Sequence, residues 1–201
     1  MTITLAQEKA FNALVYFAER IQPLYLTKAI KLLYLADEYA IKKSGVPITW
    51  LDYKVWRFGP VPEEVYNRVK RVANQKQAGL EADSLPYLDV TAPPSTLPDG
   101  VMLVPIKTFD DSEFSDYDIS ILQQVVERYG HYSGEQLVDA LHKKGTLWHR
   151  IVSANNLEEQ FQLKGNRSDY VIEFTDLLDT DYKKAAFEVA YQSYLMESNL
   201  M

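Results

Sequence analysis

Residues 28–44 constrain the fold more than any other segment, because their helical pattern is apolar on nearly every side. The apolar side chains recur at three- and four-residue spacing and then widen around the helix: Ala29, Leu32, Leu33, Ala36 and Ala40, with Ile30, Tyr34 and Ile41. Thr27 is a candidate N-cap, and Gly45 can take the left-handed conformation that closes a helix. A helix this apolar is buried in a domain core. We therefore predict a helical domain built around this segment.

Capping residues indicate several further helices. Thr4 with Gln7 and Ser133 with Gln136 have the three-residue spacing of a capping box, so a helix is expected to begin at each pair. Further helices are expected from Pro62, from Ser115 or Asp116, over residues 147–152 and over residues 181–197.

Two extended segments interrupt the helices. Residues 48–58, ITWLDYKVWRF, have the aromatic and β-branched content of a strand, and Val101–Phe109 is a second candidate strand and a plausible partner for residues 52–58. Residues 79–100 are rich in proline and lack a helical period, which predicts a long loop or insertion. The expected fold is mainly α (α+β). It is a single compact helical domain over residues 1–201, with about six to eight helices and a small antiparallel β-hairpin.

Composition excludes several function classes. The chain has no cysteine, so disulfides, thiolate nucleophiles and thiolate zinc sites are excluded, which fits a reducing cytoplasm. The formal net charge is −7, whereas nonspecific nucleic-acid binders usually carry positive charge, so basic proteins are the expected partners and nucleic acid is not. The N-terminus lacks a signal-peptide pattern, and no apolar run approaches the ~18 residues of a membrane span. We expect a cytoplasmic protein with no membrane partner.

Signatures of catalysis are also missing from the sequence. It contains no Gly-rich phosphate loop, no nucleophile elbow and no paired-histidine zinc motif, so we predict no enzyme, no cofactor and no metal site. Asp139 lies three residues before His142, which favours a local hydrogen bond over a metal site.

Two polar segments could contact a partner. The acidic run that includes Asp110, Asp111 and Glu113 does not match a calcium loop; it fits a solvated connection at a helix start, and it could also face a basic protein. Residues 133–150 resemble two helices across a glycine turn with local basic charge. Their second helix offers mostly apolar side chains, which argues against a DNA-reading helix.

The aromatic strand allows two interpretations. Trp56 and Phe58 share one side of it, with Arg57 between them and Trp50 nearby. Core packing is one, since tryptophan is usually buried; a protein-contact surface is the other, since Trp, Tyr and Arg are enriched at interfaces. The candidate partner-binding residues are therefore Trp50, Trp56, Arg57, Phe58, Asp110, Asp111 and Glu113.

Four pieces of sequence occur in an order typical of one family. They are LLYLAD at residues 32–37, Gly45-Val46-Pro47-Ile48, Phe58-Gly59-Pro60-Val61-Pro62, and residues 129–151 with a histidine before a tryptophan. In this order they resemble the Panacea-domain, SocA-like antitoxins, from the Thr27 helix to Arg150. The positions that match the family's motifs are Asp37, Gly45, Pro47, Gly59, Pro60, His142 and Trp148. Leu147 departs from the family's usual proline before the tryptophan, and the 79–100 loop is a second departure.

The resemblance implies a function that the residue chemistry does not. It implies a non-enzymatic antitoxin that neutralises a cognate protein toxin, encoded beside it, by direct protein–protein binding. Members of the family pair with unrelated toxins, and some act as adaptors that deliver the toxin to a protease. A proteolytic adaptor and a DNA-binding transcriptional regulator are therefore the alternative functions.

Overall fold

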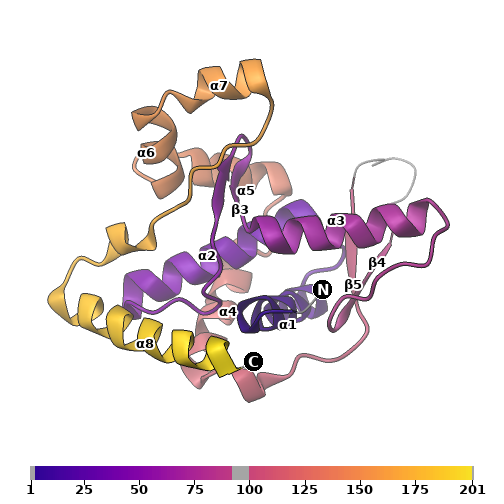
Figure 1. The fold of residues 1–201 in the computed structure, drawn as a ribbon, viewed down its shortest axis with the longest axis horizontal. Coiled ribbons are helices and arrows are strands. Elements are labelled where there is room, and N and C mark those ends of the chain that lie inside the picture. Colours follow the sequence, from indigo (N-terminus) through magenta and orange to yellow (C-terminus); the bar gives the residue numbers. More distant parts are fainter. Residues whose placement is uncertain (1–2, 92–99, 201) are drawn as a thin grey trace.

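The computed structural model describes residues 3–91 and 100–200, and this part of the chain contains eight α-helices with five short strands (Figure 1). The helices are α1 (Leu5–Arg20), α2 (Leu26–Ser44), α3 (Glu63–Gln77), α4 (Asp116–Tyr129), α5 (Gly134–His142), α6 (Leu147–Ala154), α7 (Leu157–Lys164) and α8 (Asp181–Leu200). The strands are β1 (Leu24–Tyr25), β2 (Lys54–Trp56), β3 (Gly59–Val61), β4 (Leu88–Thr91) and β5 (Met102–Pro105). Two 3-10 turns, η1 (Asp111–Glu113) and η2 (Phe174–Leu177), complete the elements. The predicted mainly helical fold with a small hairpin is confirmed.

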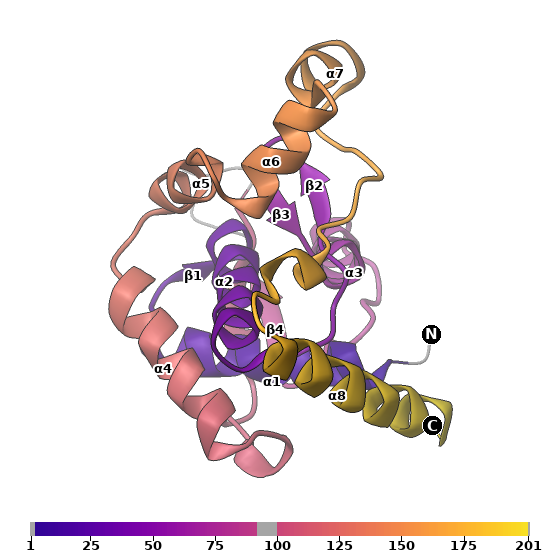
Figure 2. The same cartoon turned by 90° about the vertical axis from the view of Figure 1, so that its left-hand side faces the viewer.

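Helix α2 is the centre of the core, as its apolar pattern predicts. It contacts α1, α4, α5, β1, β3, η2 and α8, and Figures 1 and 2 show it surrounded by these elements. Its buried positions run around the helix and include the charged Lys31, Asp37 and Glu38. The apolar side chains of the helix therefore supply the core, and its buried polar side chains must find partners inside the protein.

Most predicted helix ends are confirmed. The Thr4 hydroxyl accepts from the Gln7 N–H, and Ser115 and Ser133 each form a complete capping box. The return bond expected from the Gln7 side chain is wrong, because Gln7 Nε2 donates to Glu64 Oε2 on α3 at 2.5 Å. Gly45 closes α2 at φ 88°.

The predicted cap at Thr27 is wrong. Helix α2 already begins at Leu26, with Tyr25 in the N-cap position. Because β1 leads directly into the helix, the Leu26 N–H donates to the Val101 carbonyl at 2.8 Å. A backbone partner thus replaces the side-chain cap.

The predicted pairing between residues 52–58 and 101–109 is also wrong. Strand β2 pairs with β3 immediately after it, with Val55 opposite Pro60 and Trp56 opposite Gly59. Strand β5 instead lies at the centre of a separate antiparallel sheet with the order β1-β5-β4. Its partner β4 comes from the segment predicted as a loop, of which residues 92–99 lie outside the described part.

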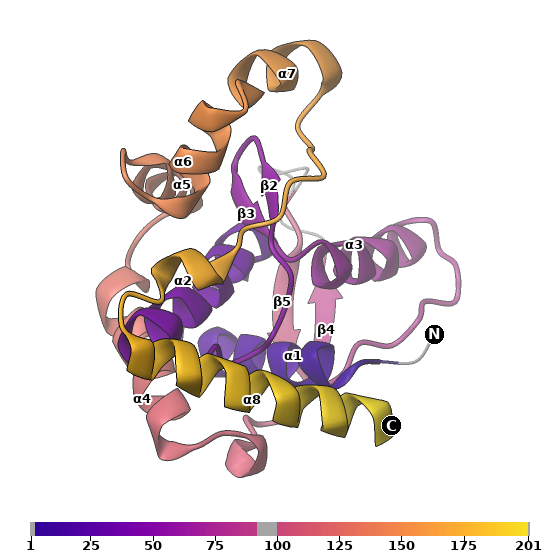
Figure 3. The ribbon, with the colours of Figure 1, turned by 60° about the vertical axis from the view of Figure 1, so that its left-hand side comes forward.

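The second half of the chain wraps around α2. Helices α4 and α5 pack directly on it, while α6 packs beside the β2–β3 hairpin and α7 extends beyond it (Figure 3). Helix α7 is not indicated by the sequence patterns above, and α8 extends the helix expected at residues 181–197. None of the helices in the described residues has both the length and the apolar character needed to cross a membrane.

Candidate functional site

The β2–β3 hairpin is the element on which the candidate site is built. Arg57 and Phe58 form its exposed tip, whereas Val55, Trp56, Gly59 and Pro60 below them are buried. The outer edge of β2 is covered, because the Val55 and Arg57 N–H groups donate to the carbonyls of Tyr170 and Asn166, both at 2.8 Å. This edge of β2 is therefore already paired, and the side chains at the tip of the hairpin stay exposed.

Lys31 fixes the hairpin from below. Its side chain is only 1% exposed, and Nζ donates to the Pro60 carbonyl oxygen at 2.7 Å. Burial lowers the pKa of Lys31 to about 7. Gly59 has φ 97°, and a Cβ there would lie 3.3 Å from Lys31 Nζ. The absence of a side chain at Gly59 thus leaves room for the Lys31 Nζ atom under the turn.

Trp148 fixes the hairpin from the side. Its indole Nε1–H donates to the Trp56 carbonyl oxygen at 2.8 Å, and its ring stacks on His142 with centroids 3.6 Å apart. Burial, with the nearby charge of Lys31 as a second cause, lowers the pKa of His142 to about 4. The predicted orientation of His142 by an Asp139 hydrogen bond is replaced by this stack, and the His142 Nε2 atom has no hydrogen-bond partner among the described residues.

Asp37 holds the segment that leads into the hairpin. Its carboxylate accepts from the N–H groups of Ile48 and Thr49 at 2.8 and 2.9 Å, from the Thr49 hydroxyl at 2.5 Å and from the Tyr53 hydroxyl at 2.7 Å. Burial raises the pKa of Asp37, although all these hydrogen bonds oppose the change. Of the other family-motif positions, Pro47 is buried beside this network, and Gly45 packs against the backbone of Lys183. The contacts of these motif residues hold the backbone of the fold in place.

A groove of about 1040 Å³ lies beside the hairpin. Its walls come from α2, the hairpin, α3, α5 and residues 166–167. The side chains that characterise it are Lys31, Trp56, Phe58, Tyr66, Asp139 and Arg167. We call it the hairpin groove. The Phe58 ring is 52% exposed at its rim, and the Arg167 guanidinium lies 4.3 Å from the centre of the Trp56 ring. The groove combines aromatic surface with fixed positive charge on the hairpin side.

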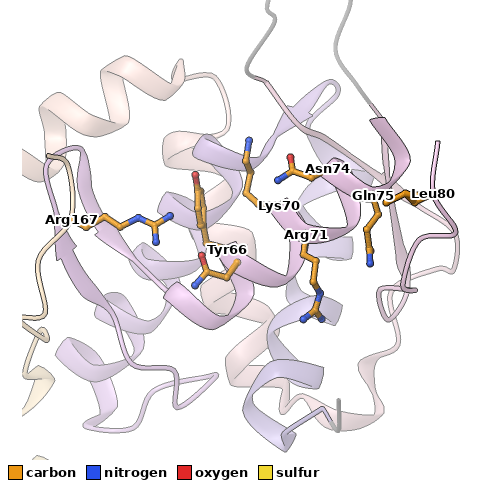
Figure 4. A pocket seen from close by; sticks show the side chains of 8 residues that line it. Tyr66, Lys70, Arg71, Asn74, Gln75, Leu80 and Arg167 are labelled. Atoms are coloured by element: carbon orange, nitrogen blue, oxygen red, sulfur yellow. The ribbon is translucent and has the colours of Figure 1, made fainter. Parts of the chain in front are cut away.

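A second, basic pocket adjoins the groove along α3. It has a volume of about 490 Å³ and shares Tyr66 and Arg167 with the hairpin groove. Figure 4 shows Lys70 and Arg71 extending from α3 on the far side of Tyr66 from Arg167. Arg71 pairs with Asp83 at 3.0 Å, so part of this charge is already balanced.

Trp50 lies elsewhere. Its ring packs against Phe187, Tyr191 and Tyr194 of α8, with centroids 5.3, 5.5 and 5.4 Å away. It is thus separated from Trp56 and Phe58, although the three are close in sequence.

None of the three acidic candidates lines the hairpin groove, and Glu113 lies near Trp50 instead. Asp110 is held by Asn12, whose amide donates to the Asp110 carbonyl at 2.6 Å, and Asp111 and Glu113 form the 3-10 turn η1. Glu113 and Trp50 line the same hollow of about 600 Å³ between η1, α1 and α8, which we call the Trp50 hollow. The candidate partner-binding residues therefore form two groups. Trp56 and Phe58 line the hairpin groove, with Arg57 beside them at the hairpin tip. Trp50 and Glu113 line the Trp50 hollow, whereas Asp110 and Asp111 precede Glu113 in the chain and line neither.

Sequence reasoning missed three residues of the groove. Lys31 carried a signal, because a lysine within an otherwise apolar buried helix must find a partner. Tyr66 lies to one side of the buried valines of α3, and Arg167 comes from an irregular segment, so neither had a pattern that pointed to the hairpin. Elsewhere, the apolar side of α6 faces inward as expected, with Leu147, Trp148 and Val152 buried. Within residues 3–91 and 100–200, no cluster of histidine and acidic side chains is placed to hold a metal ion.

Comparison with known proteins gives one family. Residues 30–149 match the family described as "Antitoxin SocA-like, Panacea domain", which is more than half of the chain. No curated protein and no solved structure gives a significant match. The matched segment contains most of α2, the hairpin, α5 and the His142–Trp148 stack, and it ends before α7 and α8.

Proposed function

The chain belongs to the SocA-like antitoxin family with a Panacea domain, and from this membership we propose that it neutralises a cognate protein toxin by binding it directly. The hairpin groove is the proposed contact surface. Its occupant is a segment of the toxin, and the bound protein covers a functional region of the toxin.

The observation that carries this proposal is the contrast between the base and the tip of the hairpin. Lys31 and Trp148 hold the base through hydrogen bonds to the carbonyls of Pro60 and Trp56. The tip presents Arg57 and a half-exposed Phe58, with the Arg57 guanidinium 5.6 Å from the Phe58 ring. Aromatic and arginine side chains dominate binding energy at protein interfaces, and a surface that is already rigid loses little entropy on binding.

The groove has positive charge on one wall and negative charge on the other, which favours a protein ligand that carries both signs of charge. Arg167 lies on the hairpin side, while Glu135 and Asp139 lie on the α5 side. An aromatic floor between opposite charges fits a folded segment of polypeptide, whose side chains can satisfy both walls.

Phe58→Asp tests the contact surface, with Ile106→Asp as the matched control. Ile106 is 60% exposed at the end of β5, so both changes place a carboxylate at an exposed apolar position. In co-expression with the neighbouring toxin gene, Phe58→Asp should neutralise the toxin less well than the wild type. In a binding measurement with the purified toxin, the affinity should fall about thirtyfold, as expected for loss of a central interface residue. Ile106→Asp should behave as the wild type.

The same experiment tests the antitoxin function itself. Equal growth inhibition by the toxin with and without the wild-type protein would refute it. Toxin half-life in the presence of the protein separates direct masking from delivery to a protease, because an adaptor shortens that half-life and a masking antitoxin does not. A stable toxin in a soluble complex is the expected result.

A further inference from the structure

Helix α8 carries two apolar stripes on opposite sides. The inner stripe consists of Phe187, Tyr191 and Tyr194, which pack on Trp50. The outer stripe follows alternating three- and four-residue steps along the helix: Tyr182, Ala185, Val189 and Met196, with the polar Gln192 at one step, where its amide donates to Glu188 at 3.0 Å. At 100° per residue, the centres of the two stripes are about 170° apart around the helix. Because the inner stripe faces the body of the protein, the outer stripe faces away from it. Figure 3 shows α8 at the surface of the molecule.

The outer stripe is exposed over its whole length. Tyr182, Val189 and Met196 are 77%, 69% and 67% exposed, and they follow one another at seven-residue intervals. Single exposed apolar residues are ordinary, but a stripe in heptad register is the pattern of a helix that packs against another helix. The stripe is therefore a candidate interface for one partner helix.

Acidic side chains flank the outer stripe. Asp181 and Glu188 lie next to it on one side, and Glu197 lies toward the other side, where it lines the Trp50 hollow with Glu113. The positive charges of α8 are already paired, since Lys184 lies 3.5 Å from Asp181 and Lys183 lies 2.8 Å from Asp179. In the described part of the chain, Glu113, Glu188 and Glu197 form no ion pair.

We infer that the outer stripe of α8 binds an amphipathic helix of the toxin whose apolar face is flanked by lysine or arginine. The inference rests on the proposed function for the source of that helix. The stripe from Tyr182 to Met196 is about 21 Å long, so it accommodates about four helical turns. A second copy of the chain is a poor occupant, because it would bring the same acidic flanks and a further net charge of −7. A basic helix pairs its charges with acidic groups that have no ion pair in the free protein.

The test of the apolar contact is the double variant Val189→Glu/Met196→Glu. Leu163→Glu is the matched control, because Leu163 is 83% exposed on α7. Circular dichroism and thermal unfolding establish that each variant is folded. Calorimetric titration with the purified product of the adjacent toxin gene should show affinity reduced about tenfold or more for the double variant and unchanged for the control. Equal affinity of the double variant and the wild type would overturn the inference while leaving the proposed function intact.

Two peptides test the charge of the partner without using the toxin. Both carry the same leucine-rich helical face, and their flanking positions are all lysine in one peptide and all glutamate in the other. The lysine peptide should bind the wild type about tenfold more tightly at low salt, and Glu188→Lys with Glu197→Lys should abolish the difference. Equal binding of the two peptides would overturn the inference. So would gel filtration in which the double variant converts a wild-type dimer to a monomer without changing toxin affinity, because the occupant would then be a second copy.

Discussion

Lys31 makes the stability of this protein depend on pH in a way that a single substitution can remove. The side chain is 1% exposed, and burial lowers its pKa from 10.5 to about 7. Above pH 10.5 the amine is neutral in both the folded and the unfolded chain, so its contribution to stability is fully present. As the pH falls toward 7, the unfolded chain binds a proton that the folded protein does not, and stability falls by about 1.4 kcal/mol per pH unit. Below pH 7 the accumulated loss is about 5 kcal/mol.

Lys31→Met removes this titration and keeps most of the side-chain volume. The variant also loses the hydrogen bond to the Pro60 carbonyl oxygen, which costs about 1–3 kcal/mol at every pH. The variant should therefore be more stable than the wild type at pH 6, by about 2–4 kcal/mol. Between pH 7 and pH 9 this advantage should shrink by about 2–3 kcal/mol, because the wild type recovers stability as the unfolded chain loses its excess proton.

Urea denaturation of both proteins at pH 6, 7, 8 and 9 measures this difference directly. Lys144→Met is the control for the change in net charge, because Lys144 is exposed between α5 and α6. Parallel pH curves for wild type and Lys31→Met would refute the reasoning. They would mean that Lys31 holds its proton equally in the folded and unfolded states.

Three further predictions concern other buried positions. Gly45→Ala should destabilise the protein by about 1–2 kcal/mol more than Gly79→Ala in parallel thermal unfolding. Both glycines have positive φ, but a Cβ at Gly45 would lie 2.5 Å from a carbonyl oxygen of α8, and nothing lies within 4 Å at Gly79. Asp37→Ala should lower the free energy of unfolding in urea by about 3–5 kcal/mol, because it leaves buried donors without an acceptor. Asp37→Asn keeps an acceptor oxygen and should lose less, so equal losses for the two variants would contradict this reasoning. The imidazole of His142 should titrate near pH 4 by NMR, so the stability that the neutral ring contributes is lost as the pH falls from 6.5 toward 4; titration at its ordinary value would show that the ring is not buried as described.

Local signals in the sequence predicted much of the helical framework. Thr4, Ser115 and Ser133 mark true helix starts because a side-chain cap depends on only the next few residues. The failure at Thr27 has the opposite cause. There a carbonyl about seventy residues later in the chain, at Val101, takes the place of the cap, and no local pattern reports it.

Strand pairing was the least predictable part of the fold. The segments around Val55 and Leu103 both have strand composition, but composition does not say which segments pair. Residues 57–58 form a two-residue turn that joins β2 to β3 directly, and the buried Gly59 and Pro60 were interpreted as a link between a strand and a helix. The separation of Trp50 from Trp56 could not be predicted for the same reason: local composition does not report long-range contacts. It depends on α8, whose docking on Trp50 is a long-range contact.

The residues that identify the family and the residues proposed to contact a partner lie in different parts of the hairpin. The motif residues Gly59, Pro60, His142 and Trp148 all lie at or against its base, where they fix the backbone through Lys31 and the Trp56 carbonyl. We expect a substitution there to alter the position of the whole hairpin. The tip has no such constraint, because the side chains of Arg57 and Phe58 are exposed. A scaffold of this kind can present different tip residues on the same base, so the sequence features that identify the family do not by themselves identify the partner.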